Sequence, residues 1–121
     1  MAKLIRLTAG QLKLSACWIN IMGPHCHHSG HIHPLSTISG TFYLNTPPLS
    51  GVIKFEDPRL GFFMASPPRR QLCQPKNKRF HVVKPRTGDL LLFESWLRHE
   101  VTVNENDEDR LSISFNYDWL S

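Results

Sequence analysis

The 121-residue sequence lacks long hydrophobic runs and helical periodicity. No apolar stretch approaches the roughly 18 to 20 residues of a membrane span. The segment 1–6 lacks the apolar core and cleavage site of a secretory signal. No amphipathic helix pattern is visible, so we expect any helix to be short and to lie in a loop. Cysteine is scarce, and the spacing of Cys17, Cys26 and Cys73 matches no disulfide framework, which favours a reducing, cytoplasmic setting.

Charge of one sign is also limited, because the formal net charge is only +4. Much of the basic excess lies in residues 59–86, where it could attract nucleic acid or an acidic substrate. This segment has no interleaved row of aromatic residues for base stacking. We therefore favour a solvated loop and expect no nucleic-acid or membrane partner.

The composition, 40% hydrophobic and 20% charged, is that of a globular chain, and the length predicts one domain over residues 1–121. Short strand-like runs separated by Pro, Gly and Asn predict an all-β sandwich or barrel. We expect strands over residues 12–21, 37–45, 52–55, 80–83, 90–93, 95–103 and 110–116. The long segment at about 57–79 is predicted to be a lid or substrate-binding loop.

The last predicted strand alternates polar and apolar residues without a break. Its polar positions are Arg110, Ser112, Ser114 and Asn116. On a surface strand the polar face meets water, whereas in a small barrel it can line a ligand cavity. The alternation alone does not choose between these two arrangements.

A histidine-dense run contains His31 and His33, which project from the same face if they lie on one strand. A metal that performs chemistry needs about three protein ligands and open positions for substrate. His99, on a later predicted strand, is the natural third ligand. Cys26 also lies in the run, but an open iron site prefers imidazole and oxygen ligands. The competing interpretation is a surface loop that binds metal adventitiously.

Arg110 and Ser112 follow His99 on a strand that we expect to be its antiparallel neighbour. An arginine and a hydroxyl on one strand face form a clamp for a carboxylate. An arginine inside a barrel also needs a counter-charge, which an anionic ligand would supply. Taken alone, Arg110 could instead form a surface salt bridge with the acidic run 107–109.

Six segments, in this order, resemble the Fe(II)- and 2-oxoglutarate-dependent oxygenases, and among them a bacterial and phage subgroup of 2OG-Fe(II) oxygenases. They are Trp18-Ile19-Asn20, His28-Ser29-Gly30-His31-Ile32-His33-Pro34, Ser39-Gly40-Thr41-Phe42-Tyr43-Leu44, Phe55-Glu56-Asp57-Pro58-Arg59, Phe93-Glu94-Ser95-Trp96-Leu97-Arg98-His99-Glu100-Val101 and Arg110-Leu111-Ser112-Ile113-Ser114-Phe115-Asn116. The resemblance covers residues 16–119. It implies a double-stranded β-helix (jelly-roll, cupin-like) with few or no helices.

The resemblance also implies an activity and its residues. The enzyme would use Fe(II) and 2-oxoglutarate to hydroxylate an unknown substrate, a small molecule or a peptide, with release of succinate and CO2. His31 and His99 match metal ligands. Arg110 and Ser112 match the pair that holds the distal carboxylate of 2-oxoglutarate, and Tyr43 is placed to add a hydroxyl.

His33 stands where that superfamily usually has a carboxylate. We favour His33 as a true ligand in a three-histidine site; water or the co-substrate could instead fill the position, with His33 beside it but not bound to the metal. His28 could be a substitute ligand, but we favour an exposed loop histidine. Weaker candidates for substrate contact are Arg59, Trp96 and Asn116, and Asn20 is a further candidate for the pocket lining.

Two other function classes stay open at this point. One is a cupin-like three-histidine metalloenzyme that does not use 2-oxoglutarate, and the other is a non-catalytic jelly-roll binding module. The chain barely covers a β core, so it could be a compact member, a fragment, or a protein that completes itself as a homodimer.

Overall fold

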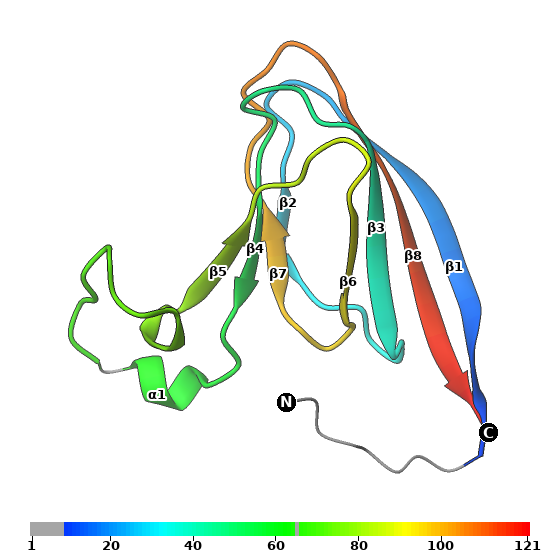
Figure 1. The fold of residues 1–121 in the computed structure, drawn as a ribbon, viewed down its shortest axis with the longest axis horizontal. Helices are drawn as coiled ribbons and strands as arrows, with labels where there is room; N and C mark the ends of the chain where they lie inside the picture. The colour runs from blue at the N-terminus through cyan, green and yellow to red at the C-terminus, as the bar shows by residue number, and fades with distance from the viewer. Residues whose placement is uncertain (1–8, 65) are drawn as a thin grey trace.

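The computed structural model describes residues 9–64 and 66–121. Within these residues the chain forms eight strands in two four-stranded antiparallel sheets, which confirms the all-β prediction (Figure 1). Sheet A has the order β1 (Gln11–Met22), β8 (Arg110–Leu120), β3 (Ile38–Asn45), β6 (Leu90–Glu94). Sheet B has the order β2 (His28–His31), β7 (His99–Val101), β4 (Ile53–Glu56), β5 (Phe80–Val83).

Two details of the strand prediction are wrong. The strand expected over residues 95–103 begins only at His99, because Leu97 N–H donates to the Glu94 carbonyl (3.0 Å) and closes a turn there. The His99 strand is also not the neighbour of the Arg110 strand, since β7 belongs to sheet B and β8 to sheet A. Residues 102–109 cross between the sheets, and the buried Asn104 amide holds the crossing by donating to the carbonyls of Met22 (2.9 Å) and Glu108 (3.0 Å).

The polar face of β8 points inward, toward sheet B. Arg110, Ser112 and Ser114 are all buried and line the space between the sheets. Cross-strand pairing places Asn20 and Tyr43 on either side of Ser112, so neighbouring strands present polar groups to the same interior. The alternation that sequence reasoning left open therefore belongs to a lined cavity, as in a small barrel.

The opposite side of sheet A, which we call the outer face, is largely apolar; Glu94 and Asn45, at the ends of β6 and β3, are its polar exceptions by register. Side chains on neighbouring strands that pair directly share one face of a sheet. The register together with the cavity lining assigns to the outer face Leu12, Leu14, Cys17, Ile19 and Ile21 of β1, Leu111, Ile113, Phe115, Tyr117 and Trp119 of β8, Ile38 and Phe42 of β3, and Leu90 and Leu92 of β6.

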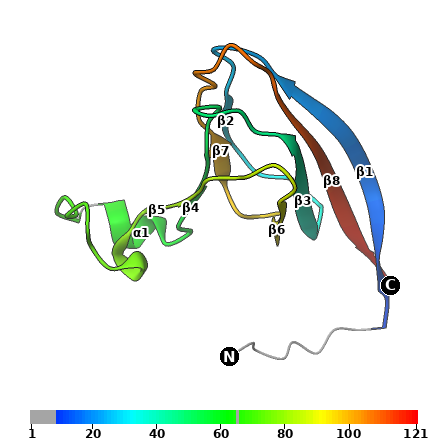
Figure 2. The same ribbon diagram turned by 45° about the horizontal axis from the view of Figure 1, so that its top comes forward.

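The segment 57–79 joins β4 to β5 and projects from sheet B (Figure 1, Figure 2). Its described part contains a short helix, α1 (Leu60–Met64), and a 3-10 turn at Pro75–Asn77. Its base is closed by Asp57 N–H, which donates to the Arg79 carbonyl (2.7 Å). None of the described helices is long and apolar enough to cross a membrane.

Candidate metal centre

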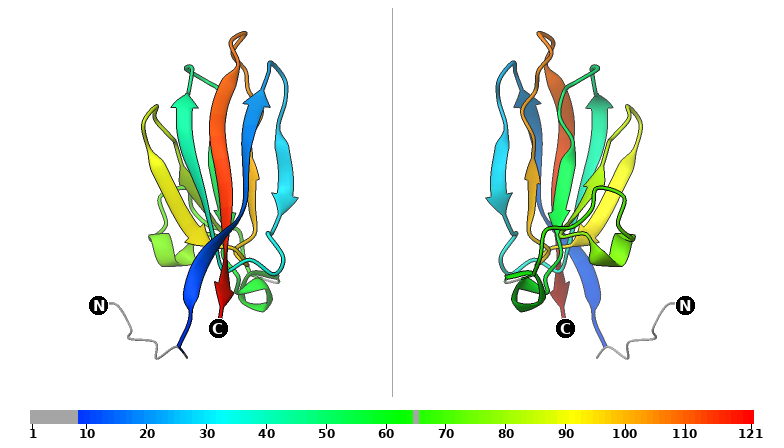
Figure 3. Two further views of the ribbon diagram at one scale, coloured as in Figure 1. Left: turned by 90° about the vertical axis from the view of Figure 1, so that its right-hand side faces the viewer. Right: turned by 90° about the vertical axis from the view of Figure 1, so that its left-hand side faces the viewer.

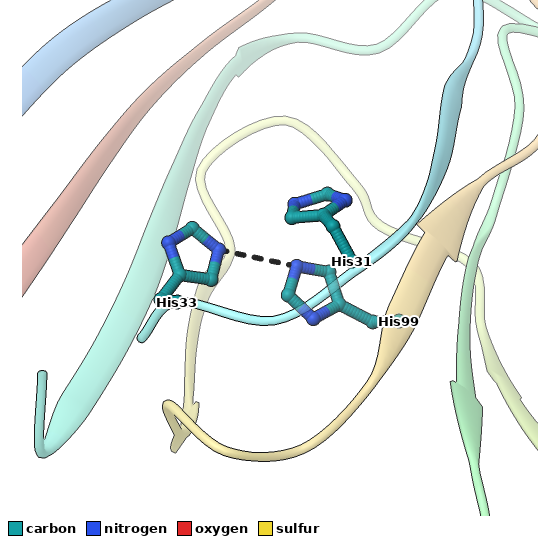
Figure 4. Close-up of side chains that lie close together, drawn as sticks. All are labelled: His31, His33 and His99. Carbon is teal, nitrogen blue, oxygen red and sulfur yellow. Dashed lines mark hydrogen bonds between the residues drawn. The ribbon is translucent and has the colours of Figure 1, made fainter. Parts of the chain in front are cut away.

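Three histidines converge at the end of sheet B. His31 ends β2 and pairs directly with His99, the first residue of β7. His33 lies two residues past the end of β2, where its backbone N–H donates to the Ser95 carbonyl (3.0 Å). One ligand nitrogen from each ring lies within 4.8 Å of the others (Figure 4). The three imidazoles can therefore bind one ion, although His33 is not on the same strand as His31.

Backbone carbonyls fix the tautomers of two of these rings. His31 Nδ1 lies 2.7 Å from the Ser29 carbonyl, and His99 Nδ1 lies 2.9 Å from the Leu97 carbonyl. Because a carbonyl only accepts, each Nδ1 carries the proton and each Nε2 keeps a free lone pair. Such a hydrogen bond also orients the ring and raises its basicity as a metal ligand.

The third ring completes a compact donor set. The rings of His33 and His99 are parallel within 2°, and their Nε2 atoms lie 3.3 Å apart (Figure 4). With the His99 Nε2 unprotonated, a proton on the His33 Nε2 can bridge the two nitrogens in the metal-free protein. A bound cation would replace that proton.

Burial favours the neutral form of two of the three imidazoles, those of His99 and His33. Burial lowers the pKa of His99 to about 4, and a hydrogen bond to the Leu97 carbonyl opposes this effect in part. The rings of Phe93 and Phe55 contact His99, with centroids at 4.7 and 5.8 Å. Burial also lowers the pKa of His33. Neutral imidazole is the form that binds metals, so the site is ready for a cation at neutral pH.

Arg110 is buried in the same cavity, and no acidic side chain in the described part of the chain forms an ion pair with it. Its side chain is 4% exposed, and among the described residues its Nε and Nη1 atoms have no hydrogen-bond partner. Its guanidinium lies 5.1 Å from the ring centre of Tyr43. Burial lowers the pKa of Arg110, and the adjacent Tyr43 acts in the opposite direction. Buried unpaired donors are costly, so the guanidinium fits an anionic ligand.

A hydrogen-bond network sets the hydroxyl of Ser112. The Asn20 amide donates to Ser112 Oγ (3.3 Å) and to Ser114 Oγ (2.7 Å), while its oxygen accepts from Trp18 Nε1 (3.0 Å). Because Ser112 Oγ accepts this bond, its own proton is available to an acceptor in the cavity. Ser112 can therefore donate to the same anion that Arg110 would bind.

The cavity between the sheets has a volume of about 480 Å³ and holds all six of the residues predicted for metal and co-substrate. These residues are His31, His33, His99, Arg110, Ser112 and Tyr43. No aspartate or glutamate is found in its lining within the described part of the chain. Thr41 and His27 also line it and were missed. Thr41 could have been predicted, because it lies two residues before Tyr43 and therefore on the same face of the strand. No pattern in the sequence distinguished His27.

The remaining predicted residues lie elsewhere. Arg59 binds Asp57 at the base of the projecting segment (Nη2 to Oδ2, 2.9 Å), and Trp96 is 54% exposed on a turn. Asn116 Oδ1 accepts from Ser39 Oγ (2.7 Å). These three are not in the described cavity lining, so their contact with substrate stays a prediction. His28 does line the cavity, and its substitute role also stays a prediction.

A family model described as "Putative 2OG-Fe(II) oxygenase" matches residues 16–116. No curated protein matches the sequence.

Among solved structures, an oxidoreductase of the 2OG-Fe(II) oxygenase family from Burkholderia pseudomallei has a TM-score of 0.67 at 18% identity, over 92% of this chain and 47% of its own. A Pseudomonas putida prolyl-4-hydroxylase has a TM-score of 0.61 at 20% sequence identity, and the match covers 84% of this chain and 51% of the hydroxylase. The non-heme alpha ketoglutarate dependent epimerase SnoN from nogalamycin biosynthesis has a TM-score of 0.63 at 17% sequence identity. This match covers 88% of this chain and 46% of the epimerase. The chain spans about half the length of these structures, and the likeness confirms the double-stranded β-helix fold.

Proposed function

The chain belongs to the 2OG-Fe(II) oxygenase family, and we propose on this premise that it is an Fe(II)- and 2-oxoglutarate-dependent dioxygenase that hydroxylates a small molecule or a peptide. The observation that carries the proposal is the buried Arg110, whose Nε and Nη1 have no partner within the described chain. It shares a cavity with three imidazoles and with no described acidic side chain. A dicarboxylate that also binds a metal fits both features.

Charge balance supports this fit. Three neutral histidines would leave a bound Fe(II) with its full charge of +2, and Arg110 adds +1. The dianion 2-oxoglutarate offsets two of these three charges. With the usual two histidines and one carboxylate, the protein itself would supply part of that negative charge. The all-histidine ligand set therefore increases the dependence of the site on an anionic co-substrate.

The residues have separate tasks in this mechanism. His31, His33 and His99 would hold the iron, which when bound couples the oxidative decarboxylation of 2-oxoglutarate to oxidation of a substrate C–H bond. Arg110 and Ser112 would bind the distal carboxylate, and the Tyr43 hydroxyl would assist them. Phe93 and Phe55 pack against the His99 ring and would exclude water from that side of the site. The protein supplies position and a dry pocket, with no need for an acid–base pair.

Several finer assignments belong to the same proposal. We place the protein in the bacterial and phage subgroup and in a reducing cytoplasm, and the three free cysteines support the second assignment. We assign substrate selection to segment 57–79, which projects from sheet B as lids and binding loops do (Figure 2).

The second candidate function is a three-histidine metalloenzyme that does not use 2-oxoglutarate. The position of His33 favours it, since all three described ligands are imidazoles. This alternative leaves the buried guanidinium of Arg110 without a role. Its turnover would not respond to 2-oxoglutarate or to loss of Arg110.

The test is the anaerobic addition of Fe(II) and 2-oxoglutarate to the metal-free protein. A weak visible charge-transfer band of a chelated 2-oxo acid is expected, together with its loss in His99→Ala and its weakening in Arg110→Ala. The exposed Arg98, which binds Glu56 outside the cavity (3.3 Å), offers the control Arg98→Ala. Tight iron binding with no band would favour the second candidate, and absence of iron binding would contradict both.

A further inference from the structure

His33 is held differently from the other two predicted metal ligands. His31 and His99 pair directly across β2 and β7, and each ring bonds a backbone carbonyl. His33 lies in the loop between β2 and β3, as Figure 4 shows, and the hydrogen bond that the structure gives its ring is to His99 Nε2 (3.3 Å). A bound cation would displace that bond. The loop backbone, together with the aromatic rings packed around it, must then hold His33 in place.

Ser95 connects the two ends of this loop through its backbone. Its carbonyl accepts from the His33 N–H (3.0 Å), and its own N–H donates to the Thr37 carbonyl (3.1 Å). Ser95 directly follows β6, in the turn that leads to His99. The loop that carries His33 and the turn that leads to His99 therefore meet at Ser95. A shift of Ser95 would change the distance between the two rings.

The side chain of Ser95 is tied to sheet A by two hydrogen bonds in series, through Ser39 to Asn116, and we call these three residues the serine anchor. Ser39 Oγ donates its single proton to Asn116 Oδ1 (2.7 Å). The contact between the Ser95 and Ser39 hydroxyls (2.7 Å) must therefore take its proton from Ser95. Ser39 and Asn116 pair across β3 and β8, which lie side by side with β6 in the left panel of Figure 3.

The serine anchor is buried by the described residues themselves. Ser39 and Ser95 are 1% and 0% exposed, so the anchor does not depend on what covers the outside of either sheet. A buried hydroxyl that loses its partner costs free energy, whereas apolar groups of the same size could fill the space without any partner. A fully bonded set of buried polar groups specifies one arrangement of its members. The anchor therefore fixes Ser95 relative to sheet A.

We propose that the serine anchor positions His33: it fixes Ser95, whose carbonyl in turn holds the His33 backbone beside the metal. The inference rests on the metal centre of the proposed function and deepens it. It gives Asn116, which sequence reasoning assigned to substrate contact, a role that acts through Ser39. Groups that orient a metal ligand from behind typically contribute roughly 10–100-fold to metal affinity. The three members are positioning residues, since none of them would bind the ion.

The first test uses Co(II) as the probe, added to the metal-free protein without 2-oxoglutarate, because its visible spectrum reports the ligand set. Ser39→Ala breaks both bonds of the anchor, so it should raise the Kd of Co(II) roughly tenfold or more and change the spectrum. Ser95→Ala breaks one bond and should act in the same direction. The matched control is Thr102→Val, beyond the far end of β7, which removes the acceptor of the Val52 N–H (2.8 Å) and should leave the Kd and spectrum unchanged.

A double-variant cycle separates positioning from a general structural defect. In His33→Ala the anchor has no ligand left to position, so the addition of Ser39→Ala should not weaken Co(II) binding further. A general defect would weaken binding by the same factor with and without His33. That result would overturn the inference.

Hydrogen exchange in the metal-free protein gives a readout that needs no ion. In Ser39→Ala the His33 amide, which donates to the Ser95 carbonyl, should exchange roughly tenfold faster. The Tyr43 amide, which donates to the Asp89 carbonyl (3.0 Å), should exchange at an unchanged rate. Equal Co(II) affinity in the wild type, Ser39→Ala and Ser95→Ala would overturn this inference alone. A wild-type protein that does not bind Co(II) would overturn the metal centre, and the inference with it.

Discussion

Replacement of Arg110 by alanine separates a ligand-binding role from a structural one. In the metal-free protein the guanidinium is buried and its Nε and Nη1 have no partner in the described chain. A buried unsatisfied group costs about 1–3 kcal/mol, so its removal relieves a cost that offsets the packing lost with the side chain. We therefore expect Arg110→Ala to change the unfolding free energy of the apoprotein by less than about 1 kcal/mol.

Binding of 2-oxoglutarate should respond very differently. Removal of one partner from a buried, hydrogen-bonded charge pair costs about 2–5 kcal/mol, which corresponds to a rise in Kd of roughly 30-fold to several thousand-fold. Arg110→Lys keeps the charge but loses the planar fork, so its Kd should fall between those of the wild type and Arg110→Ala.

Thermal unfolding with and without the co-substrate tests both expectations in one experiment. A ligand at 100 times its Kd stabilises the folded state by about 2.7 kcal/mol. With Fe(II) present, 2-oxoglutarate should raise the Tm of the wild type and of Arg98→Ala, and should stabilise Arg110→Ala by about a third as much or less at the same concentration. If Arg110→Ala unfolds the apoprotein, or if its Kd for 2-oxoglutarate is unchanged, the assignment of Arg110 as the carboxylate clamp is refuted.

Three further predictions concern other residues. His33→Asp restores a charged ligand, so it should retain Fe(II) and shift the charge-transfer band, whereas unchanged spectra would place His33 outside the metal site. Asn20→Ala removes the donor that orients Ser112, so the Kd of 2-oxoglutarate should rise roughly tenfold in calorimetry while Fe(II) affinity stays constant; equal losses of both would indicate a general structural defect. Hydrogen bonds from Arg59 lower the pKa of Asp57 to about 2, so Arg59→Ala should return this pKa toward 3.8 in a carboxyl NMR titration. A depressed carboxylate pKa contributes stability above the unfolded-state pKa that is lost as the pH falls toward 2, and a pKa that does not move in Arg59→Ala would show that this contact is absent in solution.

Most of the strands, and two of the three histidines, could be predicted from the sequence because they depend on short-range spacing. Alternation with period two marked β8, and the His31-x-His33 spacing brought two rings to one place without the need for a shared strand. The sheet to which each strand belongs depends on long-range pairing, which spacing does not encode. Adjacency of His99 and Arg110 in sequence order therefore predicted a neighbouring strand, while the crossing at residues 102–109 places them on facing sheets.

The alternation of β8 also links the chemistry of the cavity to the outer face. A slip of β8 by one residue would turn Arg110 to solvent and Leu111 into the cavity. Within the described chain the inner side buries few large apolar side chains, namely Met22, Tyr43, Ile53 and Phe55. The register that keeps Arg110 inside also turns Leu111, Ile113 and Phe115 outward, so the two faces of β8 are set by one choice of register. The same alternation thus gives β8 a polar face, where the anion would bind, and an apolar outer face.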